Sequence, residues 1–446
     1  MKAIAVALAV ALAVALAAAL AYVPSLWAVF QFDDYNVIVN YPTVHSWEAL
    51  FEHAGAGVRP LLKASYTLNW TLGGGFQLFN VLAHALNAVL LYLVGRSLFG
   101  SSAAAFVAAL LFALHPAQTE AVTYASGRSS SLMACFYLGA LLAYLRGAHW
   151  TVYGALSALL FVAALAVRET AATLPAALLL CELCRVRTDS SIPEKSNGNF
   201  SGRVPWPAVL RRQWLHWALL GAGGVFLLLN QRYFDLVAFG FGERGLAENL
   251  LTQVGGVSYL VLRLVSLHGY NIDPALPTLT HWDAVLAGQA VLLAALLAFG
   301  LASLRKRPWL AFGILWFFLQ LAPTNSLVPR LDVANDRQLY LACWGLFLAI
   351  CLQVERTSVK HAFAAASAAC ALFAGSSMLR QLDYRSEIAL WESSVRHAPW
   401  NARAYNNLGY AYQLAGRPED ARRAYELALR FDPDLRKARF NLLFLR

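Results

Sequence analysis

Two adjacent carboxylates, Asp33 and Asp34, follow directly after the first long apolar segment of the chain. A carboxylate at the end of a membrane helix is costly unless it binds a cation, accepts hydrogen bonds or transfers a proton. One of the two could therefore act as a general base that takes the proton from an acceptor hydroxyl. Adjacent Asp residues are also typical of a helix cap or a turn, and the pair alone leaves both interpretations open.

Two other patterns could suggest metal or redox chemistry. His115 and Glu120 are five positions apart, but two candidate ligands do not make a coordination sphere, so we predict no metal site. We place His115 and Glu120 at the rim of a polar site instead. Cys181 and Cys184 form a Cys-x-x-Cys pair inside an apolar segment with no second pair, which favours ordinary packing.

The elements that position these residues are membrane helices. Of the 446 residues, 59% are hydrophobic and 13% are charged, which excludes an ordinary soluble protein. The net charge of +10 comes largely from basic residues in short loops between apolar segments, so it does not indicate a nucleic-acid partner. We count about eleven apolar segments that could cross a membrane, namely 3–23, 77–95, 103–116, 130–146, 151–167, 171–184, 214–231, 283–303, 308–322, 338–353 and 361–377.

The segment 250–270 is apolar but carries Arg263 at its middle. If this segment crossed the membrane, the Arg305-Lys306-Arg307 loop would lie outside, against the positive-inside bias. We therefore expect a horizontal or re-entrant helix at 250–270, and a cytoplasmic loop at 185–213. The charged residues that end the helices then gather on the outer side, as in an enzyme that acts at the interface, whereas a transporter would carry polar residues near the midplane.

The chain divides into a membrane domain, 1–378, whose first outer loop is 24–76, and a tail, 379–446. Residues 402–435 have the large, Leu, Gly, large, Ala and Pro positions of a tetratricopeptide repeat. Gly409 and Ala421 should let the two helices of the repeat approach, and Pro433 should end the second. One repeat cannot bury both of its faces, so the tail either caps the fold or docks a protein or peptide.

Several segments, in this order, resemble a known family. They are FDDYNVIVNYP (32–42), RPLLKASYTLNW (59–70), FNVLAHALNAVLLYL (79–93), LFALHPAQTEAVTYASGRSSSL (111–132), RETAATLPAALLL (168–180), LAPTNSLVP (321–329) and NDRQLYL (335–341), followed by the repeat. The chain resembles the GT-C superfamily of polyprenol-dependent glycosyltransferases, and within it the transmembrane and tetratricopeptide-repeat-containing protein O-mannosyltransferases. The resemblance implies an all-α polytopic fold whose first outer loop carries the catalytic acid, and a donor sugar carried on a polyprenyl phosphate.

Carried over by position, the resemblance makes Asp33 the general base and lets Asp34 orient the acceptor or the loop. A phosphate leaving group needs positive charge, and Arg128 and Arg337 are the best candidates to supply it. Salt bridges or snorkelling would equally explain both arginines. Arg59 and Arg232 are further candidates for the donor phosphate, and Tyr340 joins His115 and Glu120 at the rim. For Arg168 and Glu169, a pair that neutralises itself is the simplest interpretation.

These residues predict an inverting transfer of a hexose, most simply mannose, from a polyprenyl monophosphate to a Ser or Thr hydroxyl of a secreted or periplasmic protein. Apart from this lipid-linked donor, such as undecaprenyl- or dolichyl-phosphate mannose, we expect no cofactor. Two alternatives remain: a lipid or glycan acceptor, or a non-catalytic scaffold or transporter with a docking repeat. High Ala, Leu and Arg usage with little Lys indicates a bacterial inner-membrane protein whose active site and repeat face the periplasm, or the lumen in a eukaryote.

Overall fold

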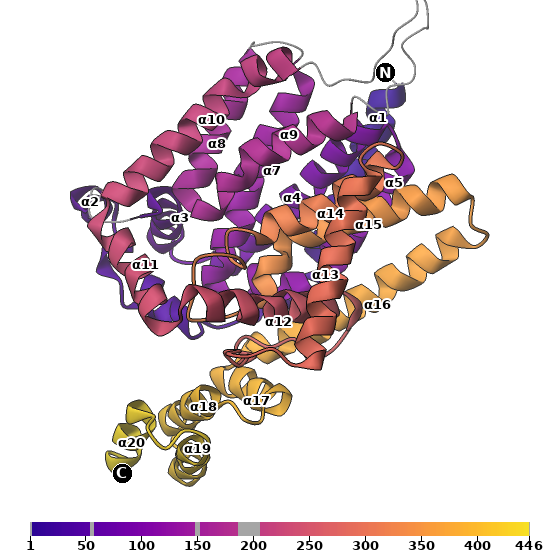
Figure 1. Ribbon diagram of the computed structural model, residues 1–446. Coiled ribbons are helices and arrows are strands. Elements are labelled where there is room, and N and C mark those ends of the chain that lie inside the picture. Colours follow the sequence, from indigo (N-terminus) through magenta and orange to yellow (C-terminus); the bar gives the residue numbers. More distant parts are fainter. Residues whose placement is uncertain (1, 54–57, 148–151, 186–205, 446) are drawn as a thin grey trace, which may run out of the picture.

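The structure is a computed structural model that describes residues 2–53, 58–147, 152–185 and 206–445. Within these ranges all regular elements are helices and no strand occurs, as expected. A large helical body holds the first four fifths of the chain, and a small set of helices at the C-terminus stands apart from it (Figure 1).

Each of the predicted apolar segments lies on a helix of the body. These helices are α1 (Lys2–Ala21), α4 (Phe76–Phe99), α5 (Ser102–Leu114), α7 (Arg128–Arg146), α8 (Val152–Val167), α9 (Leu174–Arg185), α10 (Trp206–Leu229), α13 (Ala284–Ser303), α14 (Pro308–Leu321), α15 (Leu339–Thr357) and α16 (Ala362–Leu382). Among the described residues, five helices are long and apolar enough to cross a membrane, or six if a bent pair counts as one span. The helix positions agree with the sequence, and the number of crossings stays a prediction.

Local signals set the ends of these helices. Gly100, with a φ of 74°, terminates α4, and Ser101 then caps α5 by accepting a hydrogen bond from the backbone N–H of Ala104 at 3.0 Å. Pro308 begins α14 at a position where its missing N–H costs nothing. A Cβ on Gly345 would lie 2.7 Å from the Trp316 ring, so this glycine allows α14 and α15 to pack closely.

Between the long helices lie shorter elements that carry polar residues. They include 3-10 turns at Val23–Trp27, Pro116–Gln118, Glu169–Thr173 and Asp336–Gln338, a π-helical turn at Tyr35–Val39, and helices α2 (Trp47–Glu52), α3 (Pro60–Thr71), α6 (Thr119–Thr123) and α11 (Gln231–Glu243). Helix α12 (Leu246–Val265) is one continuous helix, and it runs crosswise to α13 (Figure 1). This orientation suits the predicted horizontal helix at 250–270.

Two predicted boundaries shift. Most of the proposed loop 185–213 lies outside the described residues, but residues from Trp206 onward belong to α10, which has Pro207 in its first turn, where the missing N–H costs nothing. Helix α16 continues past residue 378 to Leu382, so the body ends slightly later than expected.

The tail consists of α17 (Glu387–His397), α18 (Ala402–Leu414), α19 (Pro418–Phe431) and α20 (Arg436–Leu443). Helices α18 and α19 form the predicted repeat. A Cβ on Gly409 would lie 2.6 Å from the ring of Tyr425, so Gly409 does allow the two helices to approach. The buried residues Leu408, Ala421 and Ala428 complete their contact.

Candidate active site

Asp34 holds the loop that follows α1. Its side chain is fully buried, and its two oxygens accept hydrogen bonds from the backbone N–H groups of Gln31 (3.0 Å) and Ser126 (2.7 Å). Burial raises the pKa of Asp34 to about 7, although these hydrogen bonds oppose the shift. Asp34 therefore holds the loop in position. Of the two functions predicted for Asp34, orienting the acceptor or orienting the loop, this geometry suits the second.

Of the two adjacent carboxylates, Asp33 is the one whose oxygens remain free to accept a proton. Its backbone N–H donates a hydrogen bond to the Tyr124 hydroxyl at 2.7 Å, and the preceding Phe32 has a φ of 39°. Within the described residues, neither Asp33 carboxylate oxygen forms a hydrogen bond. Burial raises the pKa of Asp33, while the charge of Arg337 opposes this shift.

Arg337 acts on the Asp33 carboxylate through its charge, although its segment lies about 300 positions further along the chain. Its backbone N–H donates to Glu120 Oε2 at 3.1 Å, and its Nε lies 3.4 Å from Glu120 Oε1. The Nε atom itself is buried without a hydrogen bond. Glu120, which is 3% exposed, thus orients Arg337 but leaves its Nε donor without a hydrogen bond.

Arg168 supplies a second buried guanidinium. It caps the turn Glu169–Thr173 at the end of α8, is 6% exposed, and donates from Nη1 to the hydroxyl of Ser130. Its Nε has no hydrogen-bond partner among the described residues. A buried cation with unused donors is unfavourable unless an anion joins it.

The adjacent positions of Arg168 and Glu169 predicted that the two side chains pair. In the described structure they form no ion pair. Glu169 instead receives two hydrogen bonds from Arg59, at 2.6 Å and 3.0 Å. Burial alone would raise the pKa of Glu169, but Arg59, assisted by Arg168, lowers it to about 2. The extended backbone of Arg168 directs the two adjacent side chains differently, and Arg168 has no carboxylate partner in the part of the chain that the structure describes.

Arg168 and Arg337 line the same small cavity. Its walls also include Ser130, Met133, Thr170, Gln320, Thr324, Gln338, Tyr340 and Leu341. The cavity has a volume of about 30 Å³, enough for about one water molecule. Burial, together with the charges of Arg337 and Arg59, lowers the pKa of Arg330, and the charge of Arg330 acts in turn on Arg168. Arg59, Arg168, Arg330 and Arg337 therefore gather around one place, which can attract an anion.

Arg128 lies elsewhere, in the protein interior. Its guanidinium donates to Asn80 Oδ1, the Ser65 carbonyl and the Phe76 carbonyl, at 2.8 to 2.9 Å, and stacks on Phe79. It is fully buried. The donor-phosphate role expected for Arg128 does not fit this geometry, because its donors already hold α3, α4 and α7 together.

The other predicted residues divide between the site and the interior. Tyr340 lines the cavity, but its hydroxyl is bound by Asn87 at 3.0 Å and by the His84 ring at 2.8 Å. His115 is fully buried and hydrogen-bonds the Leu264 carbonyl at 3.2 Å, so it packs against α12 and does not reach the rim. Arg232 falls on α11, but its side chain lies outside the described part of the chain.

Sequence reasoning missed Arg168 and Arg330 as site residues. For Arg168 the only sequence signal of a site residue was a charge at the end of an apolar helix. The adjacent Glu169 offered a simpler explanation for that charge, an ion pair between the two. In the described ranges no three His, Cys, Asp or Glu side chains come together as metal ligands would. The prediction that the site holds no metal stays a prediction.

The structure has three features expected from the sequence: an acidic residue in the loop after the first helix, a buried arginine, Arg337, whose charge acts on it, and an appended repeat. Comparison with known proteins agrees. Residues 50–209 match the mannosyltransferase (PIG-V) family model, and residues 402–435 match the tetratricopeptide repeat model.

The relatives are protein O-mannosyl-transferases of animals. F38B6.6 of Caenorhabditis elegans is 23% identical over 92% of this chain and 61% of its own, and TMTC1 of Homo sapiens is 26% identical over 94% and 55%. Tmtc1 of Drosophila melanogaster is 42% identical over a shorter stretch, 29% of this chain and 15% of its own. No solved structure matches the chain.

These similarities confirm that the chain resembles the transmembrane and tetratricopeptide-repeat-containing O-mannosyltransferases. Where the match runs along most of this chain, it spans 50% to 61% of the relative's length. The relatives named here do not bear on a bacterial origin.

Proposed function

We propose that the protein is an inverting glycosyltransferase that moves mannose from a polyprenyl monophosphate to a Ser or Thr hydroxyl of a protein. The family resemblance supports the sugar and the acceptor class. The observation that supports the proposal is that Arg168 and Arg337, from distant parts of the chain, line one cavity, and that the charge of Arg337 acts on the Asp33 carboxylate. One carboxylate and two arginines with unused donors are what a hydroxyl nucleophile and a phosphate leaving group require.

In this mechanism the acceptor oxygen attacks the anomeric carbon from the face opposite the phosphate. As the new C–O bond forms, the hydroxyl proton passes to the Asp33 carboxylate. The bond between the anomeric carbon and the phosphate oxygen breaks, and its electron pair leaves with the phosphate. Arg337 and Arg168 neutralise the growing charge on that phosphate, a task for which the planar guanidinium is well suited.

Asp34 and Glu120 would act through other groups. Asp34 fixes the loop that carries Asp33, and Glu120 fixes Arg337. Holding both substrates in line would supply much of the rate enhancement. On this proposal the arginines replace the divalent metal that nucleotide-sugar donors require, so we expect no metal dependence.

We further propose that the protein is embedded in a membrane with about eleven crossings, and that its site faces the periplasm or lumen. Phe32 contacts Trp391 of the tail with ring centroids 5.3 Å apart. The repeat and the loop of Asp33 therefore lie at the same end of the molecule, and would face the same compartment.

The test is transfer of radiolabelled mannose from polyprenyl-phosphate mannose to Ser- and Thr-containing acceptor proteins by the purified full chain. Asp33→Asn should lower transfer by at least about a hundredfold, the low end of general-base effects. Asp434→Asn is the matched control, because Asp434 is a fully exposed residue of the tail. Transfer by Asp33→Asn at a near wild-type rate would remove the catalytic assignment. If the radiolabel were found only in lipid or glycan, the acceptor would be a lipid or a glycan and not a protein.

A further inference from the structure

Gln338 carries a buried amide that the mechanism above does not use. It is the last residue of the turn Asp336–Gln338 and is 8% exposed. Its Nε2 and Oε1 atoms are both buried, and neither forms a hydrogen bond within the described residues. Burying an amide whose donor and acceptor are both unused is unfavourable. The position of Gln338 therefore favours a partner other than the protein, either a ligand or a water molecule.

The turn holds Gln338 at the wall of the cavity that Arg168 and Arg337 also line. The backbone N–H of Gln338 donates to the Asn335 carbonyl at 3.1 Å, and α15 begins with the next residue. The preceding residue, Arg337, is fixed by its backbone hydrogen bond to Glu120. The backbone of Gln338 is thus held from both sides, and its amide shares one cavity with two guanidinium groups.

The unused polar atoms at the cavity are of two kinds. Arg168 and Arg337 each keep an Nε donor without a hydrogen bond among the described residues, and a guanidinium has no acceptor. These groups suit an ionised phosphate, whose oxygens accept. Gln338 offers a donor and an acceptor side by side, which suit a group that both donates and accepts. A sugar hydroxyl is such a group, whereas the Gln338 Oε1 would repel an ionised phosphate oxygen.

The size and the other walls of the cavity also suit part of a sugar. Met133 and Leu341 are apolar, and Gln320 and Thr324 add polar groups. A mainly apolar wall with a few placed polar groups is typical of a small-molecule site. The cavity volume of about 30 Å³ corresponds to about one water molecule. It therefore has room for one hydroxyl group, while the ring that carries this hydroxyl would lie outside the cavity.

We propose that Gln338 binds a hydroxyl group of the donor's hexose, beside the arginines that bind its phosphate, and so contributes to the choice of sugar. The hydroxyl oxygen accepts from Nε2, and the hydroxyl proton is donated to Oε1. A sugar without this hydroxyl leaves the buried amide unpaired, which is how a polar site rejects an analogue. The identity of the lipid-linked donor rests on the proposed function.

The test compares two ligands that differ only by the sugar. Binding of tritiated polyprenyl-phosphate mannose and of tritiated polyprenyl phosphate is measured with the purified full chain in detergent. Gln338→Met keeps the length of the side chain and removes both polar atoms. It should weaken binding of the mannosyl lipid at least tenfold, about 1.4 kcal/mol, and leave binding of the sugar-free lipid unchanged. Arg168→Met should weaken binding of both lipids, because both carry the phosphate.

A matched control and a stability measurement separate binding from folding. Gln353→Met makes the same change near the other end of α15, where Gln353 accepts a hydrogen bond from Trp309 Nε1 at 3.1 Å. This variant should bind both lipids as the wild type does. Gln338→Met removes no hydrogen bond of the described structure, so its melting temperature without lipid should not fall. A lower melting temperature with equal loss of both lipids would make Gln338 structural and overturn the proposal.

Donors that each lack one free hydroxyl of the mannose identify the group that Gln338 binds. One of them should bind the wild type as weakly as the intact donor binds Gln338→Met, and the substitution should not weaken its binding further. Additive losses for every such donor would overturn the proposal. So would equal affinity of Gln338→Met and the wild type for the intact donor, since the amide would then hold only a water molecule.

Transfer assays distinguish this inference from the proposed function. If the wild type transfers mannose to protein and Gln338→Met binds the mannosyl lipid as tightly as the wild type, the function stands and the assignment of Gln338 falls. If Gln338→Met loses only the mannosyl lipid while the wild type transfers no mannose to protein, the sugar site stands and the protein acceptor falls. A wild type that binds neither lipid would overturn the sugar site.

Discussion

At the scale of single residues, the same side chain has different functions in different surroundings. Arg128 and Arg168 are both buried arginines next to helix ends. Four protein oxygens accept hydrogen bonds from Arg128, whereas among the described residues Arg168 donates only to the Ser130 hydroxyl and keeps an unused Nε. Burying a charge is tolerable only with compensating bonds, so Arg128 stabilises the fold and Arg168 is ready to receive an anion.

The raised pKa of Asp33 predicts the pH dependence of transfer. A general base must be ionised, and a raised pKa means that ionisation is lost at a higher pH as the solution is acidified. The acid limb of the initial rate should therefore lie above ~3.9, the ordinary value for Asp. Rate measurements between acidic and neutral pH check this.

Asp34 could also give an acid limb, because its pKa is about 7. Asp34→Asn keeps an acceptor for the backbone and removes this ionisation. If the limb persists in Asp34→Asn, it belongs to Asp33. A limb that disappears would assign the titration to Asp34 and contradict the prediction.

At the scale of elements, close approach between helices depends on a few small residues. Gly409 lies against the Tyr425 ring in the contact between α18 and α19. Because α18 also carries Arg403, which binds Asp273 and Asp332 of the body, the spacing of α18 and α19 affects the whole tail.

Gly409→Ala should destabilise the tail by about 1–3 kcal/mol, because a methyl group would overlap the Tyr425 ring and force the helices apart. Thermal unfolding followed by circular dichroism measures the change. The matched control is Gly375→Ala on α16, where a Cβ would meet nothing within 4 Å. There the added methyl should stabilise the helix by roughly 0.5–1 kcal/mol. Equal effects at both positions would contradict the role given to Gly409.

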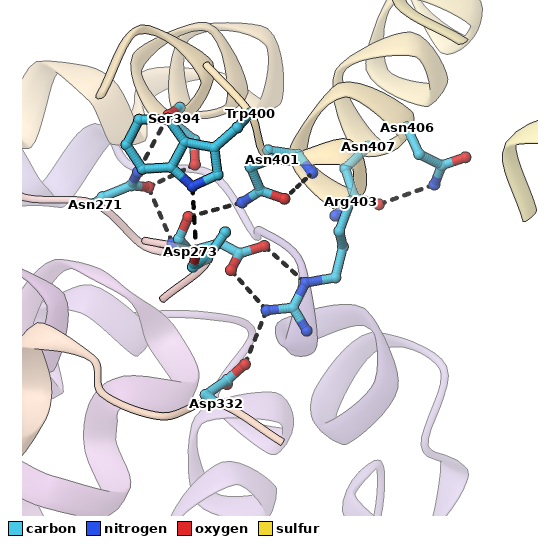
Figure 2. A network of polar contacts seen from close by, with 11 residues as sticks. Asn271, Asp273, Asp332, Ser394, Trp400, Asn401, Arg403, Asn406 and Asn407 are labelled. Atoms are coloured by element: carbon cyan, nitrogen blue, oxygen red, sulfur yellow. Dashed lines mark hydrogen bonds and ion pairs between the residues drawn. The ribbon is translucent and has the colours of Figure 1, made fainter. Parts of the chain in front are cut away.

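At the scale of the whole molecule, the tail is attached to the body by polar contacts. Arg403 joins α18 to Asp273 and Asp332, Asn401 donates to the Asp273 carbonyl at 2.8 Å, and Asn271 donates to the Ser394 carbonyl at 3.1 Å (Figure 2). Asn271 also donates its backbone N–H to Asp336, the neighbour of Arg337. The segment 332–337 therefore touches both the tail and the site.

Arg403→Ala should loosen the tail, because it leaves Asp273, which is 4% exposed, without its cation. The loss should be about 1–3 kcal/mol, less than for a fully buried pair, since Arg403 is 45% exposed. Limited proteolysis between α16 and α18 should become several times faster. Arg423→Ala removes an arginine that is 75% exposed and should not change the cleavage rate. Equal cleavage of both variants would show that the contact does not hold the tail.

The sequence by itself determined the helices and the repeat. Apolar runs of sufficient length, glycines and prolines at their ends, and the repeat spacing are local signals, and local signals set where helices begin and end. It also singled out Arg337 and Glu120, which are in contact in the structure, and Asp33, on which the charge of Arg337 acts. Whether the segments cross a membrane about eleven times is still a prediction.

Only the tertiary structure decided which arginines face the site. Arg128 was expected there and is enclosed by α3, α4 and α7; Arg168 was expected to pair with Glu169, which binds Arg59 from another segment. His115 turns toward α12. The reason is physical: the direction of a side chain and the acceptors it meets depend on which distant elements pack beside it, and neither residue type nor spacing along the chain contains that information.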